Sequence, residues 1–478
     1  MQVKHQLNKA ILDSLMGKYS LYIFQIISLA ILSRIFTPEM FGVIAAFQVF
    51  ILFFQLLATS GLAPAIIYKG SLSKVERNGI FTVSLLIGVF GSLTFFYSTP
   101  YLAVWLNLEN VSILSWVLAF NVLFSSLSML PMAALQQDSK FLVLAKAEIT
   151  SEVCSLVITL GLFYLGFGIE ALASKLLFVP IFRFIFYYIN SSNTFIGQPQ
   201  FGSNLSAMST LMSFAKYQLA FNVLNYFSRN LDTILLTKYF GVATVGFYEK
   251  SYQVMRYPLQ LFTFAITPAL QPVLTKYKDQ VDIIEKEYYP IAFKLAMLGF
   301  FVAWVLFWGA EEVVYIMFGP QWHEAAHFLS LLSVSIPLQM VLSSTGGIYQ
   351  AVGKPKLQFY CGLFSSIINI SMIVLGVYFS DLVLLCQLLV TGFIINFIQC
   401  FWIMQCKIFN RKFNAGLLII FFIILCPYIN LLFFDVVEHS AVQLLTYQGA
   451  FYHLLILGGS SLFVTGVLYF YLQKNYWK

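Results

Sequence analysis

The chain has 478 residues, of which 60% are hydrophobic, 18% are aromatic and only 10% are charged, and its formal net charge is +7. This composition excludes an ordinary water-soluble domain, in which about 25% of residues are charged, and it places the chain in a lipid bilayer. The positive net charge requires no nucleic-acid partner, because basic loops on the inner side of a membrane account for it.

Long apolar segments recur from residue 19 almost to the C-terminus, each near the roughly 20 residues that a helix needs to cross a bilayer. They are continuous rather than alternating, so they predict helices and not barrel strands. The predicted fold is therefore an all-α polytopic membrane protein with about fourteen transmembrane helices. In chain order, the predicted segments are 19–36, 41–66, 79–98, 111–133, 147–167, 169–190, 214–238, 243–272, 289–309, 326–350, 357–379, 381–405, 415–434 and 449–472.

Loop charges predict the orientation of these segments. Lys69, Lys74 and Arg77 are typical of the loops on one side, whereas the turns on the other side carry acidic residues such as Glu39 and Glu170. Loops rich in lysine and arginine stay in the cytoplasm. We therefore expect both termini on the cytoplasmic side and an even number of spans.

A stretch rich in Ser, Asn and Gln after the sixth segment predicts a linker between two halves. A short internal repeat agrees: "LSRIFTPEMFG" (32–42) and "LTKYFGVATVG" (236–246) align without gaps, and both end in glycine. Parallel repeats with a substrate site between them are a common transporter design. The predicted divisions are an N-terminal six-helix lobe (1–190), a cytoplasmic linker (191–213), a C-terminal six-helix lobe (214–406) and a final helix pair (407–478).

Polar and ionisable residues recur at helical spacing inside the predicted spans, where burying charge is costly enough to mark candidates for function. One stripe in 214–238 comprises Asn222, Asn225, Tyr226, Arg229 and Asp232, and one in 243–272 comprises Glu249, Gln253, Arg256 and Gln260, beside Tyr248, Lys250 and Tyr252. Weaker stripes hold Gln48, Gln55 and Thr59, then Asn121, Ser125 and Ser128, then Glu148, Glu152, Ser155 and Thr159.

The intramembrane charges lean positive, with Lys175, Arg183, Arg229, Lys250, Arg256 and Lys294 against Glu148, Glu152, Asp232 and Glu249. Surplus cations suit a phosphate group, and amide and tyrosine side chains suit a sugar. The alternative is a purely structural role, in which Arg229 neutralises Asp232 and Glu249 neutralises Arg256 as ion pairs between helices.

Residues 323–327, His-Glu-Ala-Ala-His, have the spacing of a zinc-protease motif. Such a site needs a third ligand, yet residues 328–380 contain no Asp, Glu or His. The first carboxylates after them are Asp381 and Asp435, of which Asp381 is the distant candidate for a third ligand. An intramembrane zinc protease using His323, Glu324 and His327 is therefore the less favoured alternative. We expect instead an amphipathic entry to segment 326–350, with Trp322 at the head-group level.

Residues 225–258, "NYFSRNLDTILLTKYFGVATVGFYEKSYQVMRYP", resemble the signature of the bacterial oligosaccharide flippases, the Wzx-type polysaccharide exporters of the multidrug/oligosaccharidyl-lipid/polysaccharide transporter superfamily. "SRIFTPEMFG", "GLAPAIIYK" (61–69) and "PMAALQQDSKFLVLAKAEI" (131–149) are similar too, so the resemblance spans about residues 15–405. It implies a V-shaped transporter of the bacterial cytoplasmic membrane. Two six-helix lobes would rock to carry an undecaprenyl-diphosphate-linked oligosaccharide to the outer leaflet, with segments 415–434 and 449–472 peripheral.

The resemblance also suggests roles for individual residues. Arg229, Lys250 and Arg256 are expected to contact pyrophosphate or anionic sugar, and Asn225, Tyr226, Tyr248, Tyr252 and Gln253 to contact sugar, with Lys175, Arg183 and Lys294 as secondary cations. Asp232 and Glu249 would organise those cations or titrate, and Glu148 and Glu152 join them as candidates for proton coupling.

The expected partners are the lipid-linked oligosaccharide, membrane lipids and the polysaccharide polymerase with its chain-length machinery. No ATP-binding P-loop is present, so energy is expected from a proton or sodium gradient or from removal of the substrate on the outer side. Neither a cofactor nor enzymatic activity is expected. A drug/cation antiporter of the same superfamily is the alternative, although its cavity should be acidic. A glycan polymerase is disfavoured because no long outer loop is present.

Overall fold

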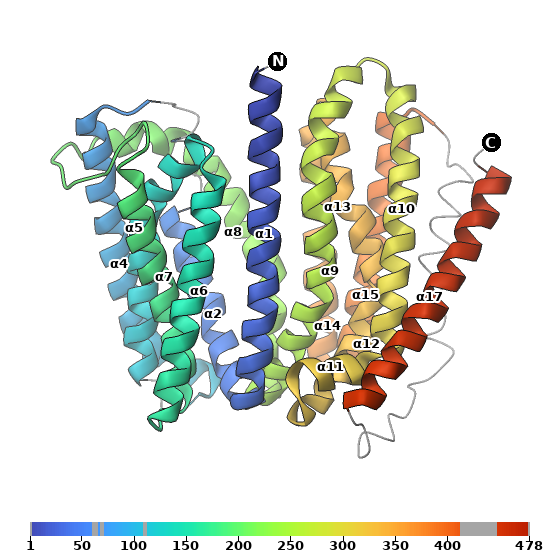
Figure 1. Cartoon of the computed structure of the whole chain (residues 1–478), viewed down its shortest axis with the longest axis horizontal. Coiled ribbons are helices and arrows are strands. Elements are labelled where there is room, and N and C mark those ends of the chain that lie inside the picture. Colours follow the sequence, from blue (N-terminus) through green and yellow to red (C-terminus); the bar gives the residue numbers. More distant parts are fainter. Residues whose placement is uncertain (1, 60–65, 67–70, 109–111, 412–446, 477–478) are drawn as a thin grey trace. The chain divides into compact units, whose positions relative to one another are not determined.

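The computed structural model describes residues 2–59, 66, 71–108, 112–411 and 447–476. All regular secondary structure in these residues is helical (Figure 1), which confirms the all-α fold. Seven of the described helices are long and apolar enough to cross a membrane, or eight if one bent pair counts as a span. The count of fourteen spans therefore stays a prediction, and the segment 415–434 lies outside the described residues.

The chain divides into two compact units, Met1–Gly246 and Phe247–Lys478. In the first unit, α5 packs between α4 and α7, α6 packs on α7 and α1, and α8 packs on α2 and α4. The predicted division at 191–213 stays a prediction. The helices of the first unit are α1 (Gln2–Ile35), α2 (Pro38–Thr59), α4 (Lys74–Leu106), α5 (Ser112–Gln137), α6 (Phe141–Tyr164), α7 (Ile169–Ser191) and α8 (Ala207–Phe240), followed by the first turn of α9 (Val242–Leu274).

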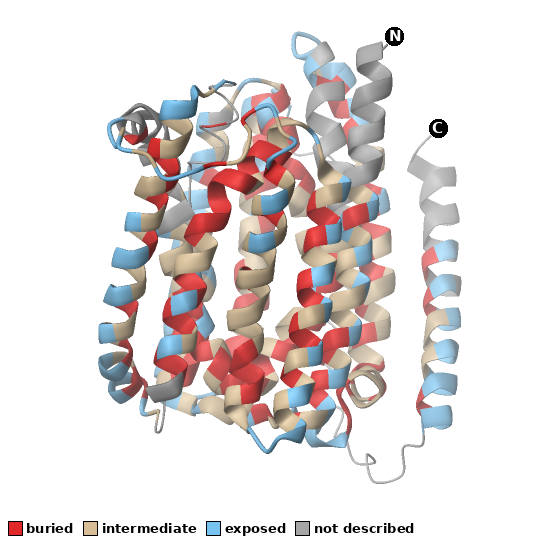
Figure 2. Ribbon diagram, turned by 60° about the vertical axis from the view of Figure 1, so that its left-hand side comes forward, coloured by how far each residue is buried: buried red, intermediate tan, exposed pale blue. Residues whose placement is uncertain are grey.

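Burial alternates along the described helices, so most of them carry both buried and exposed residues over their length (Figure 2). In α4, for example, Phe95 is fully buried, whereas 72% of Phe90 and 78% of Val104 is exposed. Apolar side chains on the outside of a helical bundle are what a lipid environment stabilises. The buried faces, by contrast, hold each helix against its neighbours.

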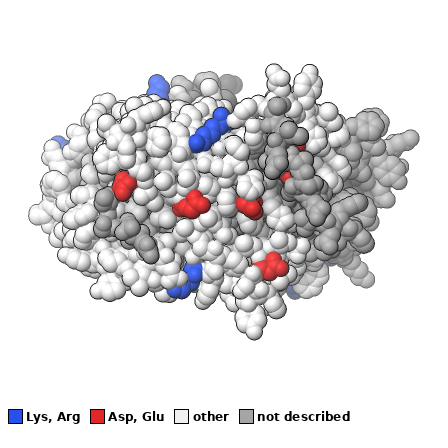
Figure 3. Space-filling model, turned by 90° about the horizontal axis from the view of Figure 1, so that it is seen from below, with Lys and Arg blue, Asp and Glu red and all other residues white. Residues whose placement is uncertain are grey.

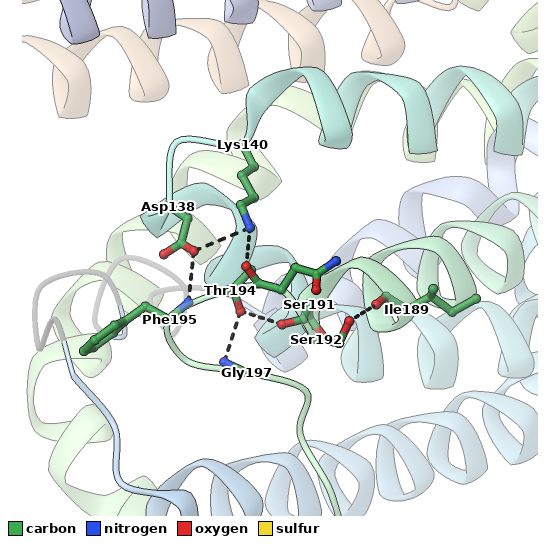
Figure 4. A network of polar contacts seen from close by, with 9 residues as sticks. Asp138, Lys140, Ile189, Ser191, Ser192, Thr194, Phe195 and Gly197 are labelled. Atoms are coloured by element: carbon green, nitrogen blue, oxygen red, sulfur yellow. Dashed lines mark hydrogen bonds and ion pairs between the residues drawn. The ribbon is translucent and has the colours of Figure 1, made fainter.

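The connection after α7, residues 192–206, forms an ordered strap across one end of the first unit (Figure 4). The Asp138 carboxylate accepts a hydrogen bond from the backbone N–H of Phe195 at 2.9 Å, and the Lys140 ammonium donates to the carbonyl of Asn193. The loop between α5 and α6 therefore holds the start of the strap.

Three side chains at the beginning of α4 hold the rest of the strap. The Arg77 guanidinium donates to the Ile196 carbonyl at 2.9 Å. The Asn78 amide oxygen accepts from the backbone N–H of Gln200 at 3.0 Å, and the Thr82 hydroxyl accepts from that of Gly202 at 2.9 Å. Because side chains satisfy these backbone groups, the strap keeps one conformation without any helix or strand of its own.

The second unit is also a bundle, in which α10 packs on α13 and α17, and α14 packs on α15. The predicted segment 326–350 is here part of two helices bent by 54°, and the second begins at Ile336 with Pro337 in its first turn. Proline cannot donate to the preceding turn, so the bend falls there. The elements are the remainder of α9, α10 (Val281–Trp308), α11 (Ala310–Phe318), α12 (His323–Ser333), α13 (Ile336–Ala351), α14 (Pro355–Tyr378), α15 (Leu382–Ile403) and α17 (Tyr447–Tyr476), with short 3-10 turns at 275–277 and 320–322 and a π-helical turn at 404–408.

Polar contacts fix both ends of this unit. The Arg411 guanidinium bridges two carboxylates of α10, at 2.9 Å from Asp282 and 3.1 Å from Glu285. The hydrogen bond to Glu285 and the charges of both carboxylates raise the pKa of Arg411. On α17, His453 pairs with the buried Glu312 of α11, so the last described helix is held by a polar contact as well as by packing.

Candidate substrate site in the membrane-spanning helices

An ion pair lies inside the first unit, among α1, α6 and α7. The Lys175 ammonium is 3.1 Å from the Glu152 carboxylate and donates to the Ser28 hydroxyl at 2.8 Å. Only 8% of the Glu152 side chain is exposed, against 22% of that of Lys175. Two of the predicted charges therefore neutralise each other here.

A second acidic group lies one turn earlier on α6. The Glu148 carboxylate accepts a hydrogen bond at 3.1 Å from the hydroxyl of Tyr187, which is buried. Arg183 is one turn before Tyr187 on α7, and its buried Nε has no hydrogen-bond partner among the described residues. A buried guanidinium nitrogen without a partner is costly, so it is suited to receive an acceptor.

A neutral polar chain crosses the same unit from α2 to α7. The Gln55 amide donates to the amide oxygen of Asn121 and to the hydroxyl of Ser125, both on α5. Asn121 donates in turn to the backbone carbonyl of Leu176. Pro180 has no N–H, so it leaves the carbonyl four residues earlier, that of Leu176, without its helical partner. Asn121 therefore satisfies a backbone group that the proline exposes.

The predicted stripe on α8 is split between different environments. Tyr226 donates its hydroxyl to the carbonyl of Val49 on α2, and Asp232 is buried and accepts from the backbone N–H of Thr233 at 2.8 Å. Arg229 is exposed. The side chain of Asn225 lies outside the described residues. Of this stripe, Arg229 is the residue that can reach a ligand without breaking a contact that the structure describes.

The predicted stripe on α9 forms a compact aromatic and cationic group in the second unit. The Arg256 guanidinium carbon lies 4.2 Å from the centre of the Tyr252 ring, and the Tyr252 and Tyr248 rings are 5.6 Å apart. Gln253 donates to the Tyr257 hydroxyl at 2.9 Å. The contact with the tyrosine ring restrains the guanidinium, a group whose planar fork of N–H donors suits an anion.

The other predicted charges of the second unit differ in exposure. Lys250 is buried at 9% exposure, Glu249 is partly buried and Lys294 is exposed. Each unit thus contains exposed cations in apolar helices: Arg229 in the first, and Arg256 and Lys294 in the second. All three side chains are exposed, whereas Lys175 is paired with Glu152.

The sequence did not indicate three of these partners. Ser28 and Tyr187 lie among apolar residues with no polar stripe around them, and the Leu176 carbonyl belongs to the backbone. Pro180 was the available signal for the last of these, since a proline within a transmembrane helix frees the carbonyl four residues before it.

The His-Glu-Ala-Ala-His segment forms the first turn of α12. His323 and Glu324 are exposed, with 3.3 Å between the His323 Nε2 and Glu324 Oε1 atoms, whereas His327 is partly buried. Among the described residues, no three His, Cys, Asp or Glu side chains gather as a metal site requires. The Trp322 side chain is fully buried and packs against Phe318 and Phe247. Its position at the head-group level stays a prediction.

Charged side chains are sparse on the face seen from below in Figure 1, where α11 lies. Single acidic and basic side chains there are separated by wide uncharged areas (Figure 3). The basic side chains visible on this face do not gather into a patch.

Comparison with known proteins agrees with these features. A family described as "Polysaccharide biosynthesis protein" matches residues 31–327. The chain is 24% identical over 387 residues to an uncharacterized membrane protein in the cps region of Klebsiella pneumoniae, which covers 80% of this chain and 78% of that protein. It is 22% identical over 376 residues to the succinoglycan biosynthesis transport protein ExoT of Rhizobium meliloti (strain 1021), covering 77% and 74% respectively.

Among solved structures, the lipid II flippase MurJ in an inward closed conformation matches with a TM-score of 0.73 and 10% identity, over 96% of this chain and 99% of that one. At this identity the likeness concerns the fold alone. The family match confirms the resemblance to polysaccharide transporters noted in the sequence. Because the matched region, residues 31–327, is more than half of the chain, the chain belongs to the polysaccharide biosynthesis protein family.

Proposed function

We propose that this protein is a flippase that moves an undecaprenyl-diphosphate-linked oligosaccharide from the inner to the outer leaflet of the bacterial cytoplasmic membrane by alternating access. The cargo would be a repeat unit of O-antigen, capsule or exopolysaccharide. The process needs no covalent step, so the protein is proposed to be a transporter and not an enzyme. Its two six-helix lobes would be residues 1–190 and 214–406, joined at 191–213, with both termini in the cytoplasm.

The observation that carries this proposal is the stacking of Arg256 on Tyr252 inside a mostly apolar helix. A planar guanidinium binds two phosphate oxygens at once, and the neighbouring tyrosines offer ring faces to a sugar. Arg229, exposed on α8, is proposed as a second contact to the pyrophosphate. Family membership supports a polysaccharide precursor as the cargo.

Coupling to an ion gradient is proposed, with no cofactor. Glu148 and Glu152 are the candidates from α6 because both carboxylates lie between packed helices beside a polar partner. The polysaccharide polymerase and its chain-length machinery are proposed as partners, since they act on the same lipid-linked precursor.

A drug/cation antiporter is the second candidate, because the superfamily includes such transporters. It requires a carboxylate free to bind a cationic drug. In the first unit, however, Glu152 is already paired with Lys175, and Glu148 accepts a hydrogen bond from Tyr187. The exposed cations at Arg229, Arg256 and Lys294 favour an anion.

The test is translocation of a lipid-diphosphate-linked oligosaccharide in proteoliposomes, comparing the wild type with Arg229→Ala and Arg256→Ala. We expect the wild type to translocate, and both variants to lose activity by about 100-fold, as when a charge-assisted contact to phosphate is removed. Lys278→Ala, which removes an exposed cation outside the apolar helices, is the matched control and should keep full activity. Wild-type rates in both arginine variants would refute their roles.

A further inference from the structure

The strap, residues 192–206, lies on one face of α4. Asn78 and Thr82, one turn apart on that helix, accept hydrogen bonds from two backbone N–H groups of the strap at 3.0 Å and 2.9 Å. Between them, a Cβ atom on Gly79 would lie 1.9 Å from the carbonyl oxygen of Asn204. The strap therefore rests against the beginning of α4 on the face that these residues share.

Further along α4, the same face carries apolar side chains. Steps of three or four residues lead from Thr82 through Leu86, Phe90, Leu93 and Tyr97, and all four of these later side chains are exposed. An exposed apolar stripe on a helix long enough to cross a membrane is a surface for lipid. The contact of the strap with α4 thus ends where this face changes from polar to apolar, between Thr82 and Leu86.

The length of this part of α4 matches the thickness of a membrane. Residues 86 and 105 are 19 positions apart, a rise of about 29 Å at roughly 1.5 Å per residue. The hydrocarbon core of a bilayer is about 30 Å thick. At the far end, the Lys238 ammonium lies 5.7 Å from the centre of the Trp105 ring, and tryptophan is enriched at membrane surfaces. This spacing puts the strap at the level of one head-group layer and Trp105 at that of the other.

Two phenylalanines of the strap face outward at this level. Phe195 is 75% exposed and Phe201 is 68% exposed. In Figure 4 the Phe195 ring points away from the polar network that holds its backbone. The neighbouring Ile196 is buried in the core of the first unit, and Phe201 rests on Phe81 with 5.5 Å between the ring centroids. Because the backbone is already fixed, inserting these rings into a lipid layer costs little conformational freedom.

Basic side chains lie at the same end of the unit. Lys74, the first residue of α4, and Lys146, in the second turn of α6, are both exposed. Lys140 donates to a carbonyl of the strap and lies 3.8 Å from Asp138, whereas Glu76 caps the start of α4. The exposed charges described around the strap therefore lean positive. Aromatic rings beside lysines are the combination with which proteins bind anionic lipid surfaces.

We propose that the strap is an interfacial anchor: Phe195 and Phe201 insert into the head-group layer of the adjoining leaflet, and the neighbouring lysines select anionic phospholipids there. The loop charges predict that this leaflet is the cytoplasmic one. A protein could also bind exposed phenylalanines, but the position of the strap at the end of the lipid-facing stripe of α4 favours lipid. The anchor is independent of what the protein transports, and it gives the connection between α7 and α8 a role of its own.

Fluorescence quenching by nitroxide-labelled lipids tests the depth of the two phenylalanines. In a variant whose six cysteines are replaced by serine, the fluorophore NBD is attached in turn to Phe195→Cys, Phe201→Cys and Phe90→Cys. In liposomes containing phosphatidylglycerol, a nitroxide on the lipid head group should quench the first two labels by about threefold or more. A nitroxide at the middle of the acyl chain should instead quench the label at 90, which lies within the lipid-facing stripe.

Lys278→Cys, exposed in the turn before α10, is the aqueous control and should be quenched by neither lipid. Labels at 195 and 201 that behave like this control, and that iodide in the water quenches instead, would overturn the anchor and leave these rings to a protein partner.

Hydrogen exchange tests the anchor with its aromatic rings in place. In nanodiscs of phosphatidylglycerol, exchange at 192–206 should be slower by about threefold or more than in nanodiscs of phosphatidylcholine, because anionic lipid holds the strap. Phe195→Ser with Phe201→Ser should abolish the difference, as should Lys74→Gln with Lys146→Gln. Phe167→Ser, which removes an exposed phenylalanine from the turn after α6, is the matched control and should preserve it.

Equal exchange of the wild type in the two lipids would overturn the selection of anionic phospholipid. A difference that survives in the double serine variant would overturn the role of the phenylalanines. Neither measurement needs a transported substrate, so failure of the anchor and failure of the flippase proposal are seen separately.

Discussion

The Lys175 ammonium lies 3.1 Å from the Glu152 carboxylate and also donates a hydrogen bond to Ser28, so a single side chain of α7 links α6 and α1. Removing two charges from water is costly, and in a low-dielectric interior they stabilise the fold only as long as they remain together. Removing one charge of this pair should therefore destabilise the fold more than removing both.

Lys175→Met should lower the free energy of unfolding by about 2–4 kcal/mol, because it leaves the buried Glu152 carboxylate without its cation. Lys175→Met combined with Glu152→Leu should recover most of that loss, since both charges are then gone. Thermal unfolding in detergent measures both effects. A single variant as stable as the wild type would show that the pair lies in a more hydrated place than its exposure indicates.

The hydrogen bond from Asn121 to the Leu176 carbonyl should contribute to stability mainly because Pro180 has no N–H to bond that carbonyl. Asn121→Ala should destabilise the fold by about 1–3 kcal/mol, because a partly buried carbonyl that proline has freed loses its donor. In a Pro180→Ala background, residue 180 regains its N–H and can bond that carbonyl, so the same Asn121→Ala change should cost clearly less. The coupling is measured by a double-mutant cycle on unfolding midpoints. Equal costs in the two backgrounds would contradict it.

Much of the fold could be predicted from the sequence, because membrane-spanning helices are encoded locally by apolar length. Segment 79–98 falls inside α4, and segment 357–379 ends one residue beyond α14. The bend at Val334–Ser335 was missed because apolar residues run through it, although Pro337 marked it. The buried position of Trp322 was also missed, since composition does not tell whether a tryptophan faces lipid or the rest of the protein.

The candidate site was harder to predict, because helical periodicity places residues on one face without saying what that face meets. It put Arg229 and Asp232 together, yet the structure exposes the first and buries the second. Spacing within α6 or α7 also could not pair Glu152 with Lys175, which are 23 positions apart in the sequence and meet only through packing. Contacts between helices require the three-dimensional arrangement.

Substituting Gly79 tests how tightly the strap, residues 192–206, is held against α4. A Cβ on Gly79 would lie 1.9 Å from the Asn204 carbonyl oxygen, so Gly79→Ala should push the strap off α4 and lower the unfolding midpoint. Gly161→Ala, with open space around it, should instead stabilise α6 by up to about 1 kcal/mol through helix propensity. Hydrogen exchange at 192–206 should rise in the first variant alone. Protection equal to that of the wild type would show that the strap adapts without opening.

Substitutions at Arg256 and Tyr252 show whether transport needs only a positive charge at this position or also the planar guanidinium. Arg256→Lys keeps the positive charge but loses the planar fork and most of the stacking. If the guanidinium grips a diphosphate, we expect this variant to be slower by about tenfold or more, with stability changed by less than about 0.5 kcal/mol because the side chain is exposed. Tyr252→Leu should show a similar loss, since it leaves the guanidinium without its support, whereas Tyr252→Phe keeps the ring and should stay near wild type. Translocation rates in proteoliposomes at matched protein levels decide the matter. Wild-type activity in Arg256→Lys would mean that the site needs only a cation, and Arg256 would then act through charge alone.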